Sequence, residues 1–165
     1  MKLTENLNNH LLLNYIRGIG KVLEDEWQKN AQTLGLTLAE QHVMWIVHSE
    51  SKVSISNIAK IGLWDRSTVM QIIKRLQAKK LIKMTKDDQD LRVTYIELTK
   101  QGKEKRELSK EKDYKLFDFI NQYETGNEAF MDELVRFHRE VNKYFHGEEF
   151  VDWVERTTVE YEESK

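Results

Sequence analysis

The sequence predicts a mostly helical protein that carries one β-hairpin. Its 165 residues include no proline and only 7 glycines, so little in the chain interrupts a helix. Apolar residues recur at three- and four-residue spacing through most of the chain, as on one face of an α-helix. Residues 81–98 differ, because two runs rich in β-branched and apolar residues flank a polar centre there, which is the pattern of a hairpin.

The first helix is predicted from about residue 8 to 31. Its apolar stripe includes Leu12, Ile16, Ile19 and Leu23. Thr37 has the position of an N-cap, and Glu40 three residues later completes a capping box, so a second helix should run to about Glu50. The centre of this second helix, residues 42–47, is apolar on nearly all sides, and we expect it to be buried.

Two short helices are expected close together in residues 54–79. Ser54 can cap the first, and Gly62 offers its stop. Asp65 or Ser67 can start the second, which should run to Lys79. Its inward stripe consists of Val69, Ile72, Ile73 and Leu76. Its outer face is short, polar and basic, with Arg66, Thr68, Gln71, Lys74 and Arg75 on or beside it.

The hairpin and three more helices complete the chain. One strand is expected over residues 81–85, a polar tip over 86–90 and the returning strand over 93–98. Thr99 can cap a long helix that runs to about Gln122, and further helices follow over residues 130–145 and 148–161. Phe150, Trp153 and Val154 lie on the last of these. A compact domain cannot cover this stripe and that of the first helix alone, so we expect two copies to pair through their terminal helices.

The distribution of charge singles out the centre of the chain. The net charge is −2, but residues 51–106 hold 14 basic and only 6 acidic side chains. A positive segment in an otherwise acidic chain is the electrostatic footprint of a phosphate-binding surface. Because a charge run is also typical of a merely solvated face, the order of the elements has to decide.

Composition excludes several classes of function. The chain has no cysteine, so disulfides, thiolate metal sites and thiol redox sensing are excluded. It lacks a signal-peptide pattern and any run near the ~20 apolar residues of a membrane span, so we expect a soluble, cytoplasmic protein. His42 and His48 do not share a helical face, so neither a metal nor a cofactor is expected, and His42 is interpreted as a core histidine. Motifs typical of enzymes are missing from the sequence, and we do not expect an enzyme.

Two helices followed by a hairpin are the order of a winged helix-turn-helix, whose second helix enters the major groove of DNA. Arginine, glutamine, serine and threonine on that helix can bond base edges, and lysines around them can neutralise phosphates. The expected DNA-contacting residues are Arg66, Ser67, Thr68, Gln71, Lys74, Arg75, Lys86 and Arg92. The alternative is an adaptor or anti-repressor whose wing and basic helix bind an acidic protein partner.

Three segments resemble the MarR family of regulators, in which an Asp-x-Arg at the wing precedes Leu-Thr-x-x-Gly. They are residues 75–83, residues 90–92 (Asp-Leu-Arg) and residues 98–102 (Leu-Thr-Lys-Gln-Gly). Residues 42–46, 55–62 and 147–150 are similar to the Hpr subgroup, also called ScoC, whose bacillar members repress genes of protease production and sporulation. The resemblance covers nearly the whole chain.

The resemblance implies a single MarR-type domain over residues 1–165. The winged-helix part would span 33–102, with the helix-turn-helix at 55–78 and the wing at 81–98, and residues 1–32 and 103–165 would form dimerisation helices. It further implies a homodimer on a pseudo-palindromic operator in double-stranded DNA. Arg92 would reach the minor groove, with Asp90 orienting it.

The sequence departs from the MarR pattern at two places. Lys80 stands where many members have a glycine, at a helix end that suits a left-handed residue. Trp64 and Asp65 stand where small polar residues are common. Many relatives also bind aromatic ligands, and Tyr15, Trp27, Trp45 and Phe117 could line such a pocket, although the sequence favours core packing for them. No feature of the sequence indicates whether a small-molecule effector exists.

Overall fold

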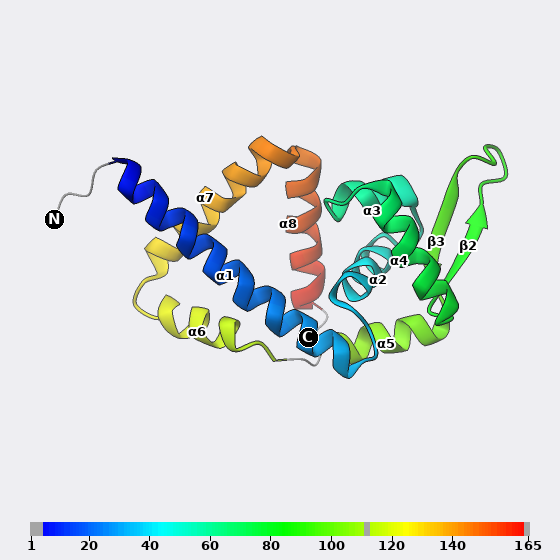
Figure 1. Cartoon of the computed structure of the whole chain (residues 1–165), viewed down its shortest axis with the longest axis horizontal. Coiled ribbons are helices and arrows are strands. Elements are labelled where there is room, and N and C mark those ends of the chain that lie inside the picture. Colours follow the sequence, from blue (N-terminus) through cyan, green and yellow to red (C-terminus); the bar gives the residue numbers. More distant parts are fainter. Residues whose placement is uncertain (1–4, 111–112, 164–165) are drawn as a thin grey trace.

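The computed structural model describes residues 5–110 and 113–163, which fold into eight helices and one small sheet (Figure 1). The helices are α1 (Glu5–Thr33), α2 (Leu38–Glu50), α3 (Ile55–Ile61), α4 (Arg66–Ala78), α5 (Lys100–Lys110), α6 (Lys115–Glu124), α7 (Glu128–His146) and α8 (Glu148–Glu163). The strands β1 (Val53–Ser54), β2 (Ile82–Lys86) and β3 (Thr94–Leu98) form an antiparallel sheet in the order β1-β3-β2. Residues 1–4, 111–112 and 164–165, which the single-domain prediction includes, lie outside the described residues.

Helix α2 forms the centre of what we call the body, which consists of α2 to α5 and the three strands. Val43, Met44, Ile46 and Val47 are almost completely buried. The inward stripe of α4 and the buried residue Ile96 of β3 belong to the same hydrophobic core. The prediction of a buried, nearly all-apolar second helix is confirmed, and this core is the support on which α3, α4 and the hairpin are held.

The N-terminal caps of three helices follow the sequence pattern. The Thr37 hydroxyl accepts a hydrogen bond from the Glu40 N–H at 3.2 Å, and the Glu40 carboxylate accepts one from the Thr37 N–H at 2.8 Å. Ser54 caps α3 by accepting from the Asn57 N–H. Asp65, and not Ser67, caps α4. These side chains satisfy backbone donors that a helix leaves open at its start.

Helices α1, α3 and α4 each end in a Schellman turn, whose residue beyond the cap is left-handed. In α1 and α4 these residues are Gly35 and Lys80, the latter with φ 59°. Lys80 therefore adopts the left-handed conformation that suits glycine, as expected. Gly62 ends α3 as its C-cap, which confirms the prediction for this helix; it has φ −77°, and the left-handed residue that follows is Leu63 with φ 55°.

The hairpin passes into α5 through a tight contact with the end of α4. The Thr99 hydroxyl donates to the Lys80 carbonyl at 2.8 Å and accepts from the Gly102 N–H at 3.1 Å. A Cβ atom on Gly102 would lie 2.0 Å from the Leu81 carbonyl oxygen, so only glycine fits there. This packing is the physical reason for the Leu-Thr-x-x-Gly pattern, in which threonine caps the helix and glycine admits the neighbouring chain.

The single helix expected from residue 100 to about 122 was wrong. Helix α5 ends at Lys110, Asp113 and Tyr114 are not helical, and α6 starts at Lys115. Hydrogen bonds to α1 hold the start of α6, so that α6 does not continue α5. The Glu26 carboxylate accepts from the Leu116 N–H at 3.1 Å, and the Asn30 amide donates to the Asp113 carbonyl at 3.2 Å. Since these partners are more than 80 residues apart, the local pattern contained no sign of the break.

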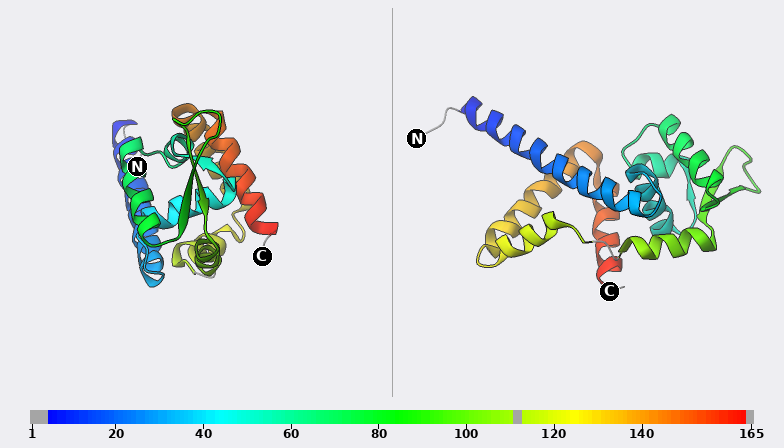
Figure 2. Two further views of the ribbon diagram at one scale, coloured as in Figure 1. Left: turned by 90° about the vertical axis from the view of Figure 1, so that its right-hand side faces the viewer. Right: turned by 60° about the horizontal axis from the view of Figure 1, so that its bottom comes forward.

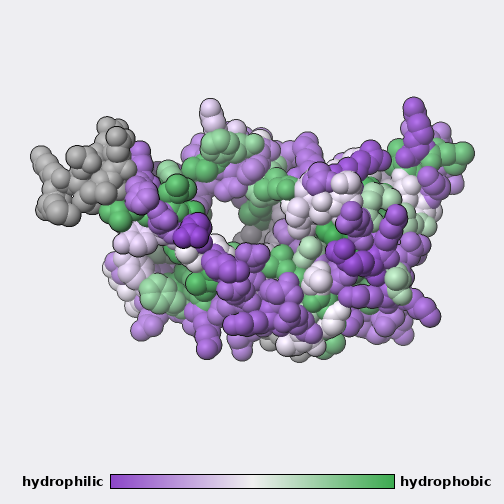
Figure 3. Space-filling view, in the orientation of Figure 1, coloured by the Kyte–Doolittle hydropathy of each residue, from purple (hydrophilic) through white to green (hydrophobic). Residues whose placement is uncertain are grey.

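Helices α1, α6 and α7 form what we call the arm, which extends away from the body (Figures 1 and 2). No residue of α6 or α7, both fully described, is buried. The space-filling view shows an opening between the arm and α8 (Figure 3). The arm therefore keeps its apolar side chains open to solvent, and those of α1 and α7 include Leu12, Leu13, Ile16, Ile19, Phe130, Val135, Phe137 and Phe145.

Helix α8 connects the arm to the body. Glu149 forms an ion pair with Lys60 of α3, and Arg156 forms one with Glu50 at the end of α2. Trp153 is buried against Trp45 of α2, with ring centroids 5.0 Å apart. We expected Trp153 to need a second copy of the chain for cover, and this was wrong, because α8 folds back onto its own body.

Candidate nucleic-acid interface

Helix α4 presents the outer face that the sequence predicts. Its inward stripe is completely or almost completely buried, which fixes the rotation of the helix about its axis. The side chains on the other side are therefore accessible. Arg66, Ser67, Gln71, Lys74 and Arg75 are exposed, and Thr68 is half-buried. The structure thus brings six of the eight predicted contact residues together on one helix.

The first turn of α4 is organised by its cap, Asp65. Its carboxylate accepts hydrogen bonds from the hydroxyl of Ser67, from the Thr68 hydroxyl at 2.6 Å and from the Thr68 N–H at 2.8 Å. These bonds hold the pKa of Asp65 well below its usual range, so the cap is charged at neutral pH. Because the hydroxyls of Ser67 and Thr68 both donate their hydrogens to Asp65, their lone pairs remain free to accept a hydrogen bond from an outside donor, such as the amino group of a base.

The C-terminal end of α4 is held by a buried carboxylate that the sequence analysis interpreted only as a cap residue. Glu40 is 1% exposed and accepts from Lys79 Nζ at 2.7 Å and from Arg75 Nε at 3.3 Å. Burial alone would raise the pKa of Glu40, but the bonds from Lys79 and from the Thr37 N–H outweigh it and lower the pKa. A buried glutamate needs cationic partners. The place of Glu40 on a helix predicted to be buried was therefore the signal from which these ion pairs could have been inferred.

The wing carries its predicted arginine at the tip. Arg92 is 91% exposed at its side chain, and its Nε and one terminal nitrogen bind the two oxygens of Asp90 at 3.0 and 3.2 Å. Asp87 accepts from the Asp90 N–H at 2.8 Å, and Lys86 Nζ donates to the Leu91 carbonyl at 3.0 Å. The tip is therefore internally braced, and a two-bond carboxylate pair orients the guanidinium.

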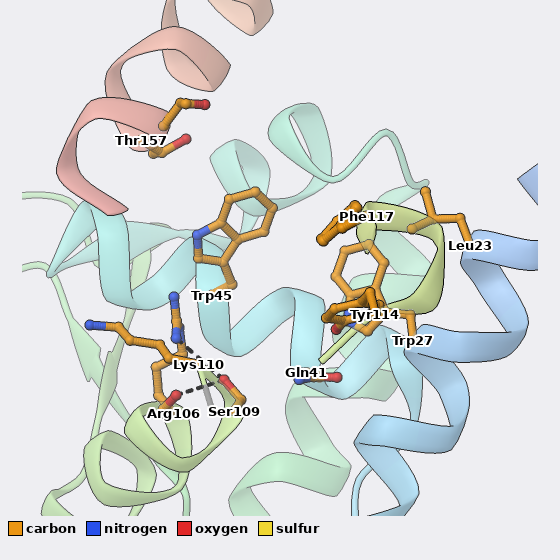
Figure 4. Close-up of a pocket in the computed structure, with 11 residues that line it drawn as sticks. Leu23, Trp27, Gln41, Trp45, Arg106, Ser109, Lys110, Tyr114, Phe117 and Thr157 are labelled. Atoms are coloured by element: carbon orange, nitrogen blue, oxygen red, sulfur yellow. Dashed lines mark hydrogen bonds between the residues drawn. The ribbon is translucent and has the colours of Figure 1, made fainter. Parts of the chain in front are cut away.

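A cavity of about 440 Å³ lies between the body and the outer helices (Figure 4). Three of the four aromatic residues considered for a pocket, Trp27, Trp45 and Phe117, line it, whereas Tyr15 is exposed and does not. The polar side chains of Gln41 and Arg106 also face the cavity, with Arg106 donating to the Ser109 hydroxyl at 3.3 Å. The walls thus come from α1, α2, α5, α6 and α8.

The described residues hold no group of three histidine, aspartate or glutamate side chains placed to bind a metal ion. His42 lies between aromatic rings in the interior, and burial lowers its pKa to about 4. Among the helices described here, none is long and apolar enough to cross a membrane.

Comparison with known proteins agrees with this geometry. The sequence model of a family described as "Transcriptional regulator SarA/Rot" matches residues 27–108. The HTH-type transcriptional regulator Hpr of Lysinibacillus sphaericus is 30% identical over 153 residues, which cover 90% of this chain and 81% of that protein. The chain belongs to the Hpr family of HTH-type transcriptional regulators.

Two further proteins are similar to this Hpr-family regulator, one in sequence and one in fold. The DNA-binding transcriptional repressor ScoC of Bacillus subtilis is 33% identical over 88 residues, covering 53% of this chain and 43% of ScoC. A cysteine-to-serine variant of MarR from E. coli, solved with operator DNA, has the same fold, with a TM-score of 0.63 at 16% identity over 81% of this chain and 97% of that one. Residues 27–108, which match the family model, span the end of α1 and all of the body except the last two residues of α5.

Proposed function

We propose that this regulator acts in the cytoplasm as a homodimeric repressor that binds pseudo-palindromic operators in double-stranded DNA. Its targets are genes of protease production and sporulation, as the Hpr resemblance implies. The chain acts as one MarR-type domain, in which residues 33–102 contact DNA and residues 1–32 and 103–165 hold the dimer together.

The observation that carries this proposal is the shared placement of α4 and the wing. Both lie at the end of the body that faces away from the arm (Figure 1). The outer face of α4 is polar and basic, and Arg92 projects from the wing beside it. A helix of this width fits the major groove, while an exposed guanidinium on a hairpin suits the adjacent, narrower minor groove.

The roles of individual residues follow from their positions. Gln71 is exposed one turn into α4, where its amide can pair with an adenine edge, and Arg66 can pair with guanine. Lys74 on this helix and Lys86 on the wing are exposed cations and suit phosphate oxygens. Arg75 shares its guanidinium with Glu40, so its contribution is smaller than that of a free arginine.

The open apolar surface of the arm supports the dimer. A two-fold dimer presents two recognition helices about one turn of DNA apart, so the operator mirrors the symmetry of the protein. The named relatives support binding to DNA, since one is a DNA-binding repressor and another was solved on operator DNA.

A salt series with purified protein tests the proposal. A dimer that neutralises about two or more phosphates per subunit loses affinity with a log–log slope of about −4 or steeper. Binding that does not depend on salt, or no binding at low salt, contradicts the proposal and favours the adaptor with an acidic protein partner.

Two substitutions separate positioning from base reading. Arg92→Ala should weaken binding to all duplexes, whereas Gln71→Ala should relax preference at particular base pairs by about 1–3 kcal/mol. Selection from random duplexes with each variant measures both effects. Arg136→Ala on α7 is the matched control, because this exposed arginine lies on the arm and should leave the preferred sequence unchanged. An unchanged preference in Gln71→Ala removes that residue from the base readers.

A further inference from the structure

All four tryptophans of the chain lie in one cluster with His42 at its centre. The His42 ring is 5.1 Å from Trp27, 5.6 Å from Trp45 and 5.0 Å from Trp64, measured between centroids. Trp153 joins through Trp45 at 5.0 Å. These residues come from α1, α2, the α3–α4 turn and α8, so the cluster connects the helix-turn-helix with both terminal helices.

Trp64 is the member of the cluster that precedes the recognition helix. It stands directly before Asp65, the cap of α4. Its backbone N–H donates to the Ala59 carbonyl at 3.0 Å, and this hydrogen bond closes the end of α3. Its indole lies against Gly62. A Cβ atom on Gly62 would be 2.4 Å from Cε3 and 2.7 Å from Cζ3 of that ring.

In this turn the left-handed residue is not the glycine. Gly62 has φ −77°, a conformation that any residue adopts, whereas Leu63 has φ 55°, which a branched side chain disfavours. The glycine is therefore needed for the space that the indole occupies and not for its backbone freedom. The hydrogen bond from the Trp64 backbone N–H to the Ala59 carbonyl closes the turn over the left-handed Leu63.

We propose that Trp64 is a positioning residue for the recognition helix. Its indole, held between Gly62 and His42, fixes the turn from which α4 starts and so sets the direction of the outer face of α4 relative to α1 and α8. Trp64 acts through this packing and does not read bases. The inference rests on the proposed DNA-binding function, and it adds the residue that aligns the base readers with the helices through which two copies pair.

Four variants test this role by selection from random duplexes and by the ratio of affinities for the selected and an unrelated duplex. Trp64→Ala should lower that ratio about tenfold or more and flatten preference at several positions of the half-site, while affinity for the unrelated duplex and its salt slope stay unchanged. Trp64→Phe should restore most of the ratio. Gly62→Ala should resemble Trp64→Ala, because the new methyl group displaces the indole. The double variant should be close to Trp64→Ala, since the two tightest contacts of the new methyl group, with the indole, are then gone and only the Ile58 carbonyl oxygen remains, at 3.0 Å.

Leu63→Gly is the matched control within the same turn, because it removes the left-handed side chain and keeps the contact of Trp64 with Gly62. It should retain the wild-type preference. Where Trp64→Ala fails to fold, Gly62→Ala carries the test, since it keeps every side chain of the cluster.

Three results would overturn the inference. The first is a normal ratio of affinities in both Trp64→Ala and Gly62→Ala. The second is a loss of preference at one base pair only in Trp64→Ala, which makes Trp64 a base reader. The third is additive effects of the two substitutions on the ratio in the double variant. In each of these the wild type still selects a sequence. A wild type that binds no duplex instead overturns the proposed function itself and the inference with it, so the two failures are distinguishable.

Discussion

The body and the arm use the same types of apolar residue in opposite ways. In the body, Ile58, Val69 and Ile73 are completely buried by other elements of the same chain. In the arm, Phe130, Phe137 and Phe145 are at least half exposed, although they follow the same helical spacing. The difference teaches that periodicity identifies the apolar side of a helix but not what covers it. In the arm, that cover is proposed to be a second copy.

The largest expected effect would break this comparison at the arm. Phe137→Asp places a charge at the proposed contact between two copies in each subunit. Burying unpaired carboxylates there should weaken dimerisation by about 4 kcal/mol, or about a thousandfold in Kd. Sedimentation velocity at micromolar concentration measures the change from dimer to monomer.

Leu91→Asp is the control for this substitution, because Leu91 is also apolar and exposed but lies on the wing. It should leave the dimer intact. A wild type that is already monomeric, or a Phe137→Asp variant that remains a dimer, would show that the exposed face of α7 does not pair two copies.

The next effect concerns His42, where the body meets α1. Burial lowers the pKa of His42 from 6.5 to about 4. The unfolded chain therefore binds a proton between these values that the folded chain does not bind. Stability is fully present above pH 6.5, falls as the pH drops and is lower by about 3 kcal/mol at pH 4. Urea unfolding at a series of pH values measures this loss.

His42→Phe should flatten that part of the profile, because the variant has nothing to protonate at the site. The pKa of His48 is also lowered, first by burial and then by the charge of Arg106, and acts with the same sign. The difference between the two proteins isolates His42. Parallel profiles would show that His42 is accessible to protons in the folded state.

A third prediction contrasts a buried and a surface carboxylate within the body. Glu40→Gln retains the capping box but removes the charge that holds Arg75 and Lys79, and should cost about 2 kcal/mol. Glu97→Gln removes the charge of a glutamate that pairs with Lys83 at 3.0 Å on the sheet surface, and should cost clearly less, because solvent screens this pair. Chemical denaturation compares the two, and equal costs would contradict the special role of Glu40.

The smallest effect concerns the end of α4. Lys80→Gly should stabilise the protein by up to about 1 kcal/mol, because glycine adopts the left-handed conformation without strain. Lys74→Gly, in the interior of the same helix, should destabilise it by about 1 kcal/mol. Thermal unfolding measures both. A loss of stability in both variants would show that Lys80 is not strained.

Much of the fold was readable from the sequence because the signals involved are local. Thr37, Ser54 and Asp65 cap helices by bonding backbone groups two or three residues away, and the apolar stripe of α4 repeats within single turns. Lys80 was recognised as the left-handed residue from its place in a short motif. The charge balance of residues 51–106 needs only counting.

Tertiary structure decided what depends on residues distant in the chain. The break before α6 follows from hydrogen bonds to Glu26 and Asn30. Arg75 forms an ion pair with Glu40, which lies 35 residues earlier in the chain. Trp153 and Phe137 look alike in sequence, yet only the first meets its own body. The sequence by itself therefore determined the order of the elements, their caps and their apolar sides. Only the packed chain decided which of those sides stay open, because burial is a property of long-range contacts and not of local spacing.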